Sequence, residues 1–175
     1  QRWRDLIELG VEQSGLAWPK GIWCDEQGKP AGLILPRIVG ENMLTIFNPK
    51  SRLIRYPGKQ STRGLISIAQ ALANRLNSLH DLGIVVGDLQ PANALLSDRD
   101  ATLWMIDLDS ASFTSKAGRK YDCEVGQRLY LPPESISAME HGAPFHSKGT
   151  DAYALANLIF HILLAGRHPM AGVPV

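Results

Sequence analysis

Cysteine is scarce in this chain: its 175 residues include only Cys24 and Cys123. The two lie far apart, and neither has a second Cys or a His at the spacing of a metal site. This scarcity argues against a disulfide framework and against a zinc site. We therefore expect two small buried thiols in a reducing compartment, and a cytoplasmic protein.

Long apolar runs are absent as well. No run approaches the roughly 20 residues that a helix needs to span a bilayer, and the first residues, QRWRDLIELG, lack the apolar core of a secretory signal. The net charge is only +1, and the Lys and Arg residues are scattered rather than gathered into a stripe. We therefore expect neither a membrane nor a nucleic acid as partner.

Two long helices are predicted by apolar residues that recur at three- and four-residue steps, in a chain that is 45% apolar and long enough for one core. The first begins at Ser61 or Thr62, either of which can cap it, and ends at Gly83 in the C′ position. The second begins at Asp151 and runs through Ala165. It is apolar nearly all round, which predicts a place in the middle of the core.

Shorter elements are predicted elsewhere. The first ten residues carry one apolar stripe and predict the end of an amphipathic helix. A polar, Gly-bearing turn between Gly21–Cys24 and Ala31–Ile38 predicts a β-hairpin with a buried second arm. Further short β-prone runs lie at residues 84–86, 94–96 and 102–106. Residues 39–59 predict a connection with room for one short helix, and residues 110–134 an irregular segment.

An acid, an amide and a second acid follow one another in the stretch 83–109. Asp88 comes after a β-prone run, Asn93 lies five positions on, and Asp107 ends another apolar run. Carboxylate and amide oxygens are hard ligands that suit Mg²⁺. A base, a metal-binding amide and a metal-binding carboxylate are the minimum set for transfer of a γ-phosphoryl group.

These residues carry a resemblance to the protein kinase superfamily. Residues 86–93, VGDLQPAN, look like the catalytic loop H-R-D-L-x-x-x-N, and DLD at 107–109 takes the place of D-F-G. Residues 125–134 are similar to the end of an activation segment that closes in A-P-E, and DAYALA at 151–156 resembles the start of the central helix of the large lobe. The resemblance covers nearly the whole chain.

The resemblance implies an α+β, protein kinase-like fold. Residues 1–38 would be a partial small lobe with a C-helix, a strand hairpin and the hinge. Residues 39–175 would be a mostly helical large lobe that is incomplete at its C-terminus. No Gly-rich loop and no strand Lys of the V-A-I-K type occur in the sequence, so we expect the chain to begin within the small lobe.

The resemblance also implies roles, with ATP and Mg²⁺ as cofactors and a protein as substrate or partner. Asp88 would take the proton of the attacking hydroxyl beside Gln90, while Asn93 and Asp107 would hold Mg²⁺. In the hinge, Leu35 would be the gatekeeper, and the carbonyl of Pro36 and the amide of Ile38 would hold adenine, since proline loses only its N–H.

Three structural roles are implied: Glu8 on the C-helix as partner of the absent Lys, Glu134 at the end of the activation segment, and Asp151 as support for the catalytic loop.

Several positions depart from the family pattern. Val86 and Gly87 replace His and Arg, which argues against control by loop phosphorylation, and Gln90 replaces a Lys, which removes a cation from the transition state. Asp109 replaces Gly, so it either adds a metal ligand or restricts the backbone motion that Gly permits. Similar Asp-x-Asp forms occur in a divergent bacterial branch of kinase-like proteins.

Three hypotheses follow. The first is a bacterial-type Ser/Thr protein kinase that uses Mg-ATP, although this chain alone would be inactive. The second is a weak or inactive pseudokinase that acts as a binding or scaffold module. The third is a kinase-like enzyme for a small molecule, which the A-P-E-like segment disfavours.

Overall fold

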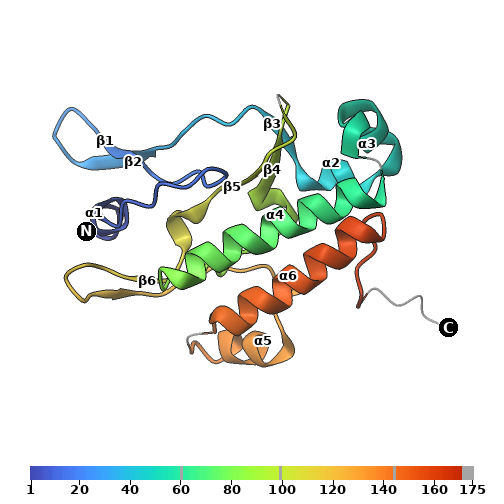
Figure 1. Ribbon diagram of the computed structural model, residues 1–175. Coiled ribbons are helices and arrows are strands. Elements are labelled where there is room, and N and C mark those ends of the chain that lie inside the picture. Colours follow the sequence, from blue (N-terminus) through green and yellow to red (C-terminus); the bar gives the residue numbers. More distant parts are fainter. Residues whose placement is uncertain (60, 99, 144, 171–175) are drawn as a thin grey trace.

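Two long helices, α4 (Thr62–Asp81) and α6 (Lys148–Leu163), lie side by side at the centre of the molecule (Figure 1). The computed structural model describes residues 1–59, 61–98, 100–143 and 145–170. Both helices begin at a serine cap: Ser61 Oγ accepts the Gly64 N–H at 3.1 Å, and Ser147 forms a capping box with Thr150.

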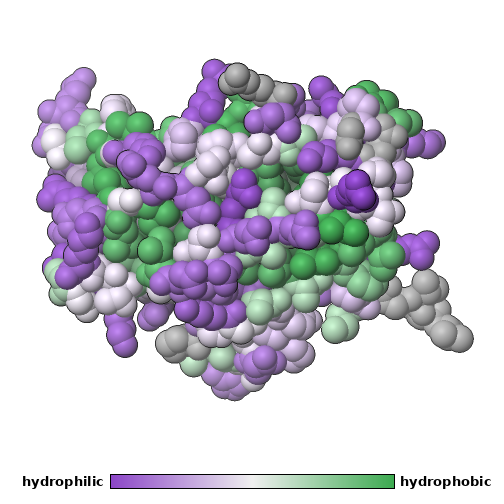
Figure 2. All heavy atoms as spheres, viewed as in Figure 1, coloured by the Kyte–Doolittle hydropathy of each residue, from purple (hydrophilic) through white to green (hydrophobic). Residues whose placement is uncertain are grey.

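The apolar stripe predicted for α4 is confirmed. Its members are all buried: Leu65, Ile68, Ala69, Leu72, Leu76 and Leu79. The prediction for α6 is wrong in two respects, because this helix begins three residues earlier than expected and only one of its faces is buried. Phe160, Leu163 and Leu164 are 36%, 40% and 45% exposed. Figure 2 shows apolar surface between polar side chains over this end of the two helices.

An antiparallel three-stranded sheet, in the order β3–β4–β5, packs against α4. Its strands are β3 (Gly40–Asn42), β4 (Ala94–Ser97) and β5 (Leu103–Met105). The last two strands were expected from their β-prone runs, whereas β3 was not. The strand predicted at residues 84–86 is wrong, since Val85 makes only an isolated bridge to Ser112.

The predicted hairpin exists as β1 (Gly21–Cys24) and β2 (Pro30–Ile34), but its second arm ends four residues early and is not buried. Ile34 and Leu35 are 51% and 45% exposed. A two-stranded sheet leaves one face uncovered, so an arm that is apolar on both faces remains partly in solvent. Cys24 is exposed as well, which corrects its predicted burial, while Cys123 is buried.

Short helices fill the segments that were expected to be irregular. Asn42 and Asn48 cap α2 (Met43–Phe47) and α3 (Pro49–Arg55), so residues 39–59 hold more than one short helix. The remaining elements are α1 (Arg2–Glu8), β6 (Phe113–Thr114), β7 (Lys120–Tyr121), α5 (Pro133–Glu140) and the 3₁₀ turns Pro57–Lys59, Pro91–Asn93, Leu108–Ser110 and Arg128–Tyr130. Within the described part of the chain, every helix is too short or too polar to cross a bilayer.

Candidate active site

The loop that follows α4 brings Asp88, Gln90 and Asn93 together. Gln90 Nε2 donates to Asp88 Oδ2 at 2.7 Å, and Asn93 Nδ2 donates to the same oxygen at 3.0 Å. Asn93 Nδ2 also donates to the backbone oxygen of Asp88 at 3.0 Å. The acid is therefore held by two neutral amides, and one of its oxygens, Oδ1, is not used by either of them.

Asp107 joins this group through the backbone. The N–H of Ile106 donates to the carbonyl of Asn93 at 2.9 Å, which places the end of β5 beside the loop. Asp107 itself adopts the left-handed conformation, with φ 58° and ψ 41°. Partial burial raises the pKa of the Asp107 carboxyl, and the neighbouring acids Asp109 and Asp88 raise it further. A cation at this position would lower that pKa again.

A cavity of about 310 Å³ is lined both by Asp107 and by the segment predicted to be the hinge. Asn93 and Asp107 line it together with Leu35, Pro36 and Ile38. The rest of the lining is apolar: Ala17, Leu95 and Ile106. The structure thus brings five of the sequence-predicted site residues to one cavity, which has a polar and an apolar part.

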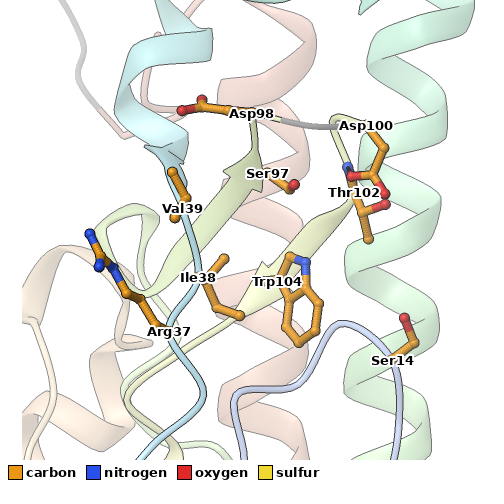
Figure 3. A pocket seen from close by; sticks show the side chains of 9 residues that line it. All are labelled: Ser14, Arg37, Ile38, Val39, Ser97, Asp98, Asp100, Thr102 and Trp104. Atoms are coloured by element: carbon orange, nitrogen blue, oxygen red, sulfur yellow. Dashed lines mark hydrogen bonds between the residues drawn. The ribbon is translucent and has the colours of Figure 1, made fainter.

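A larger cavity, of about 540 Å³, shares Ile38 with the first. Figure 3 shows its wall, with Trp104 of β5 and Ile38 projecting into it and two acids, Asp98 and Asp100, at the turn after β4. It contains neither Asn93 nor Asp107. Its size therefore does not make it the better candidate for the site.

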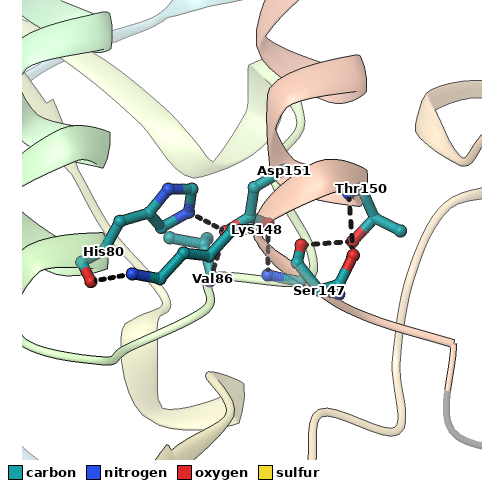
Figure 4. Close-up of polar contacts among 7 residues, drawn as sticks. His80, Val86, Ser147, Lys148, Thr150 and Asp151 are labelled. Atoms are coloured by element: carbon teal, nitrogen blue, oxygen red, sulfur yellow. Dashed lines mark hydrogen bonds and ion pairs between the residues drawn. The ribbon is translucent and has the colours of Figure 1, made fainter.

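Asp151, in the first turn of α6, lies against this loop and binds its backbone (Figure 4). Its side chain is buried and accepts the backbone N–H groups of Val86 and Gly87, each at 2.8 Å. His80 Nε2 lies 2.7 Å from its Oδ2, and Lys148 Nζ donates to the carbonyl of His80. The backbone just before Asp88 is therefore tied to the central helix.

A protein kinase domain model matches residues 43–173. The chain belongs to the protein kinase domain family. Protein kinase YegI of Escherichia coli (strain K12) is 32% identical over 162 residues, which make up 91% of this chain and 24% of that protein.

Two further relatives are more distant. Calcium-dependent protein kinase 33 of Arabidopsis thaliana is 32% identical over 152 residues, 86% of this chain and 26% of that protein. Serine/threonine-protein kinase PknG of Mycobacterium leprae (strain TN) is 30% identical over 112 residues, 64% of this chain and 13% of that protein. The chain thus spans about a quarter or less of the length of these relatives.

The packing of this kinase domain explains the glycine at position 87. Gly87 has a φ of +76°, and a Cβ there would lie 2.5 Å from Cys123 Sγ and 2.8 Å from Cys123 Cβ. The Cδ2 of His146 also borders this space and would lie 3.2 Å from a Cβ added at position 87. Cys123 and His146 are therefore packed directly on the backbone at position 87, where a larger side chain would collide with them.

The donors at the site fit a divalent cation that is shared with phosphates. Among the described residues, no group of three or more His, Cys, Asp or Glu side chains could hold a metal by themselves. Because Asn93 Nδ2 is committed to Asp88, the atom that this side chain could offer a cation is Oδ1. One carboxylate from Asp107 and one amide oxygen would leave most positions of an Mg²⁺ octahedron to water and phosphate oxygens.

Two predicted structural residues lie away from the site. Glu8 is exposed at the end of α1, and the buried acid of that helix is Asp5, which sequence reasoning missed. Glu134 is exposed in the first turn of α5 and lines a separate cavity of about 340 Å³. The contacts of the described residues do not test the roles of Glu8 and Glu134, so these roles stay predictions.

Proposed function

We propose that the protein containing this chain transfers the γ-phosphoryl group of Mg-ATP to a Ser or Thr hydroxyl of a protein substrate. One observation carries the proposal: Asn93 and Asp107 line the same cavity as the hinge residues Leu35, Pro36 and Ile38. An adenine at the apolar hinge would direct its phosphates toward the acid and the amide. We also propose that residues 1–38 belong to the small lobe and residues 39–175 to the large lobe.

Asp88 is the group proposed to receive the proton. Gln90 and Asn93 both donate to its Oδ2, so they fix the carboxylate and leave Oδ1 for the substrate hydroxyl. Asn93 Oδ1 and Asp107 would hold the Mg²⁺, which neutralises charge on the phosphates when bound. Gln90 supplies a neutral N–H where the family has a Lys, so the transition state loses one cation and the rate should be low.

A second candidate is a pseudokinase that binds or scaffolds without turnover. The amide of Gln90 already occupies the proposed base, and a second acid, Asp109, stands beside Asp107 and raises the pKa of Asp107. Both features would weaken phosphoryl transfer, while neither involves the residues proposed to hold adenine, Leu35, Pro36 and Ile38.

ATP turnover and autophosphorylation of the full-length protein distinguish the two candidates. We expect Asp88→Asn to lower turnover by about 10²-fold or more, Asp107→Asn to abolish the Mg²⁺-dependent part, and Asp81→Asn, at the exposed end of α4, to change neither. Equal background rates for wild type, Asp88→Asn and Asp107→Asn would rule out the enzyme and leave the scaffold. For the chain printed here we expect weak or no catalysis, because it lacks a Gly-rich loop and strand Lys.

A further inference from the structure

The side chain of Arg2, near the start of α1, holds the backbone that follows Asp107. Its Nη2 donates to the carbonyls of Ser110 and Ala111 at 2.7 Å each, and its Nε donates to the carbonyl of Asp109 at 3.3 Å. Its Nη1 donates to the carbonyl of Asp122 at 3.0 Å, directly after β7. One guanidinium thus joins four backbone oxygens that lie more than one hundred positions away.

The surroundings of this guanidinium fix its position further. Its Cζ lies 5.6 Å from the ring centres of both Phe113 and Tyr121, which stack on each other at 4.9 Å. A cation over aromatic faces is attracted by both rings. In Figure 1, α1 and β6 lie at the same end of the molecule. The contact is therefore a built site for one arginine rather than a surface encounter.

Three of the four carbonyls that Arg2 binds, those of Asp109, Ser110 and Ala111, lie at the end of the 3₁₀ turn Leu108–Ser110. The last carbonyls of such a turn lack partners within it, and a cation there is favourable. This turn begins directly after Asp107, whose left-handed backbone is unfavourable for a residue with a Cβ. Such a conformation persists only where the surrounding contacts enforce it.

We propose that Arg2 is the positioning residue through which α1 holds Asp107 in its metal-binding conformation. The inference rests on the proposed function, since it gives Asp107 the metal. Without the Arg2 side chain, the four carbonyls lose their donor, the 3₁₀ turn opens, and Asp107 relaxes from the left-handed conformation.

Hydrogen–deuterium exchange on the chain printed here tests the contact itself. We expect Arg2→Ala to speed exchange of the amides in residues 109–123 by about tenfold or more, as loss of a charge-assisted hydrogen bond predicts. Arg2→Lys, which keeps the charge but cannot reach four carbonyls, should fall between. Arg4→Ala is the matched control, because Arg4 is an exposed arginine on the same helix. Equal exchange in Arg2→Ala and Arg4→Ala would overturn the proposal.

ATP titrations with and without Mg²⁺ separate positioning from a purely structural tie. Mg²⁺ should raise the affinity for ATP about tenfold less in Arg2→Ala than in the wild type. Binding of ATP without metal should be the same in both, and Arg2→Lys should recover part of the Mg²⁺-dependent gain. A variant with faster exchange but an intact Mg²⁺-dependent gain would make Arg2 a structural tie and overturn the proposal alone. These titrations use the full-length protein, and a wild-type full-length protein without any Mg²⁺-dependent gain would overturn the proposed function and this inference together.

Discussion

The guanidinium of Arg119 forms a two-pronged ion pair with the carboxylate of Asp5: Nε lies 2.8 Å from Oδ2, and Nη2 lies 2.8 Å from Oδ1. The hydroxyl of Tyr121 donates to Oδ2 at 2.8 Å. Asp5 is 1% exposed, and Arg119, followed by Gln1, holds the pKa of its carboxyl well below the usual range. This pair and Arg2 both attach α1 to residues 109–122.

We expect Asp5→Asn to lower the Tm by several degrees at neutral pH, because it removes a charge that Arg119 and Tyr121 surround. The folded-state pKa of Asp5 is depressed, so its stabilising effect is present above the ordinary value of 3.8 and is lost as pH falls below it. The Tm gap between wild type and Asp5→Asn should therefore shrink on acidification. A gap that stays constant down to the lowest pH, or one that Asp81→Asn shares, would contradict this.

The buried carboxylate of Asp151 should matter more for stability than any exposed acid. Asp151→Ala leaves the N–H groups of Val86 and Gly87 without their acceptor, so we expect a loss of about 3 kcal/mol or more in the free energy of unfolding in urea. His80→Ala removes one of three donors and should cost less. The expectation fails if Asp151→Ala loses no more than about 0.5 kcal/mol, the usual range for a surface change.

The sequence predicts those elements that are specified by residues close to one another along the chain. The stripe from Leu65 to Leu79 specifies α4 because each turn repeats the same buried face, and Ser61 marks its start. Residues 84–86 show the opposite case, since a β-prone run becomes a strand only if a partner lies alongside, and here only Ser112 pairs with Val85. Short helices such as α5 have too few turns for a periodic signal.

The candidate site likewise has residues that the sequence predicts and contacts that it does not. Asp88 and Asn93 stand at a fixed spacing in one loop, so sequence alone could bring them together, and the resemblance supplied the hinge residues. The contacts of Arg2 and Asp5 could not be found this way, because their partners lie 107 to 120 positions away. A buried Asp on a short amphipathic helix was the available signal, and sequence analysis singled out Glu8 instead.

A methyl group at position 87 should displace the activation segment. Gly87→Ala places a Cβ 2.5 Å from Cys123 Sγ and also carries the cost of a positive φ. Gly118→Ala is the matched control, since Gly118 has a φ of +79° but nothing within 4 Å of the added Cβ. We expect a loss of about 1 kcal/mol for Gly118→Ala, from backbone strain alone, and at least twice that for Gly87→Ala, measured by urea unfolding. Equal losses would show that the contact with Cys123 is unimportant.

The hinge offers a test of adenine binding that leaves the acids untouched. Pro36 has no N–H, so the donor that the resemblance gives to adenine is the backbone amide of Ile38, which lines the cavity with Asp107. Ile38→Pro removes this donor, whereas Ile38→Val keeps it and changes only one methylene. We expect Ile38→Pro to weaken binding of a fluorescent adenine nucleotide by about tenfold relative to Ile38→Val, the size of one lost hydrogen bond. If both variants bind equally while circular dichroism shows both folded, adenine does not use this amide, and the nucleotide lies elsewhere in the cavity.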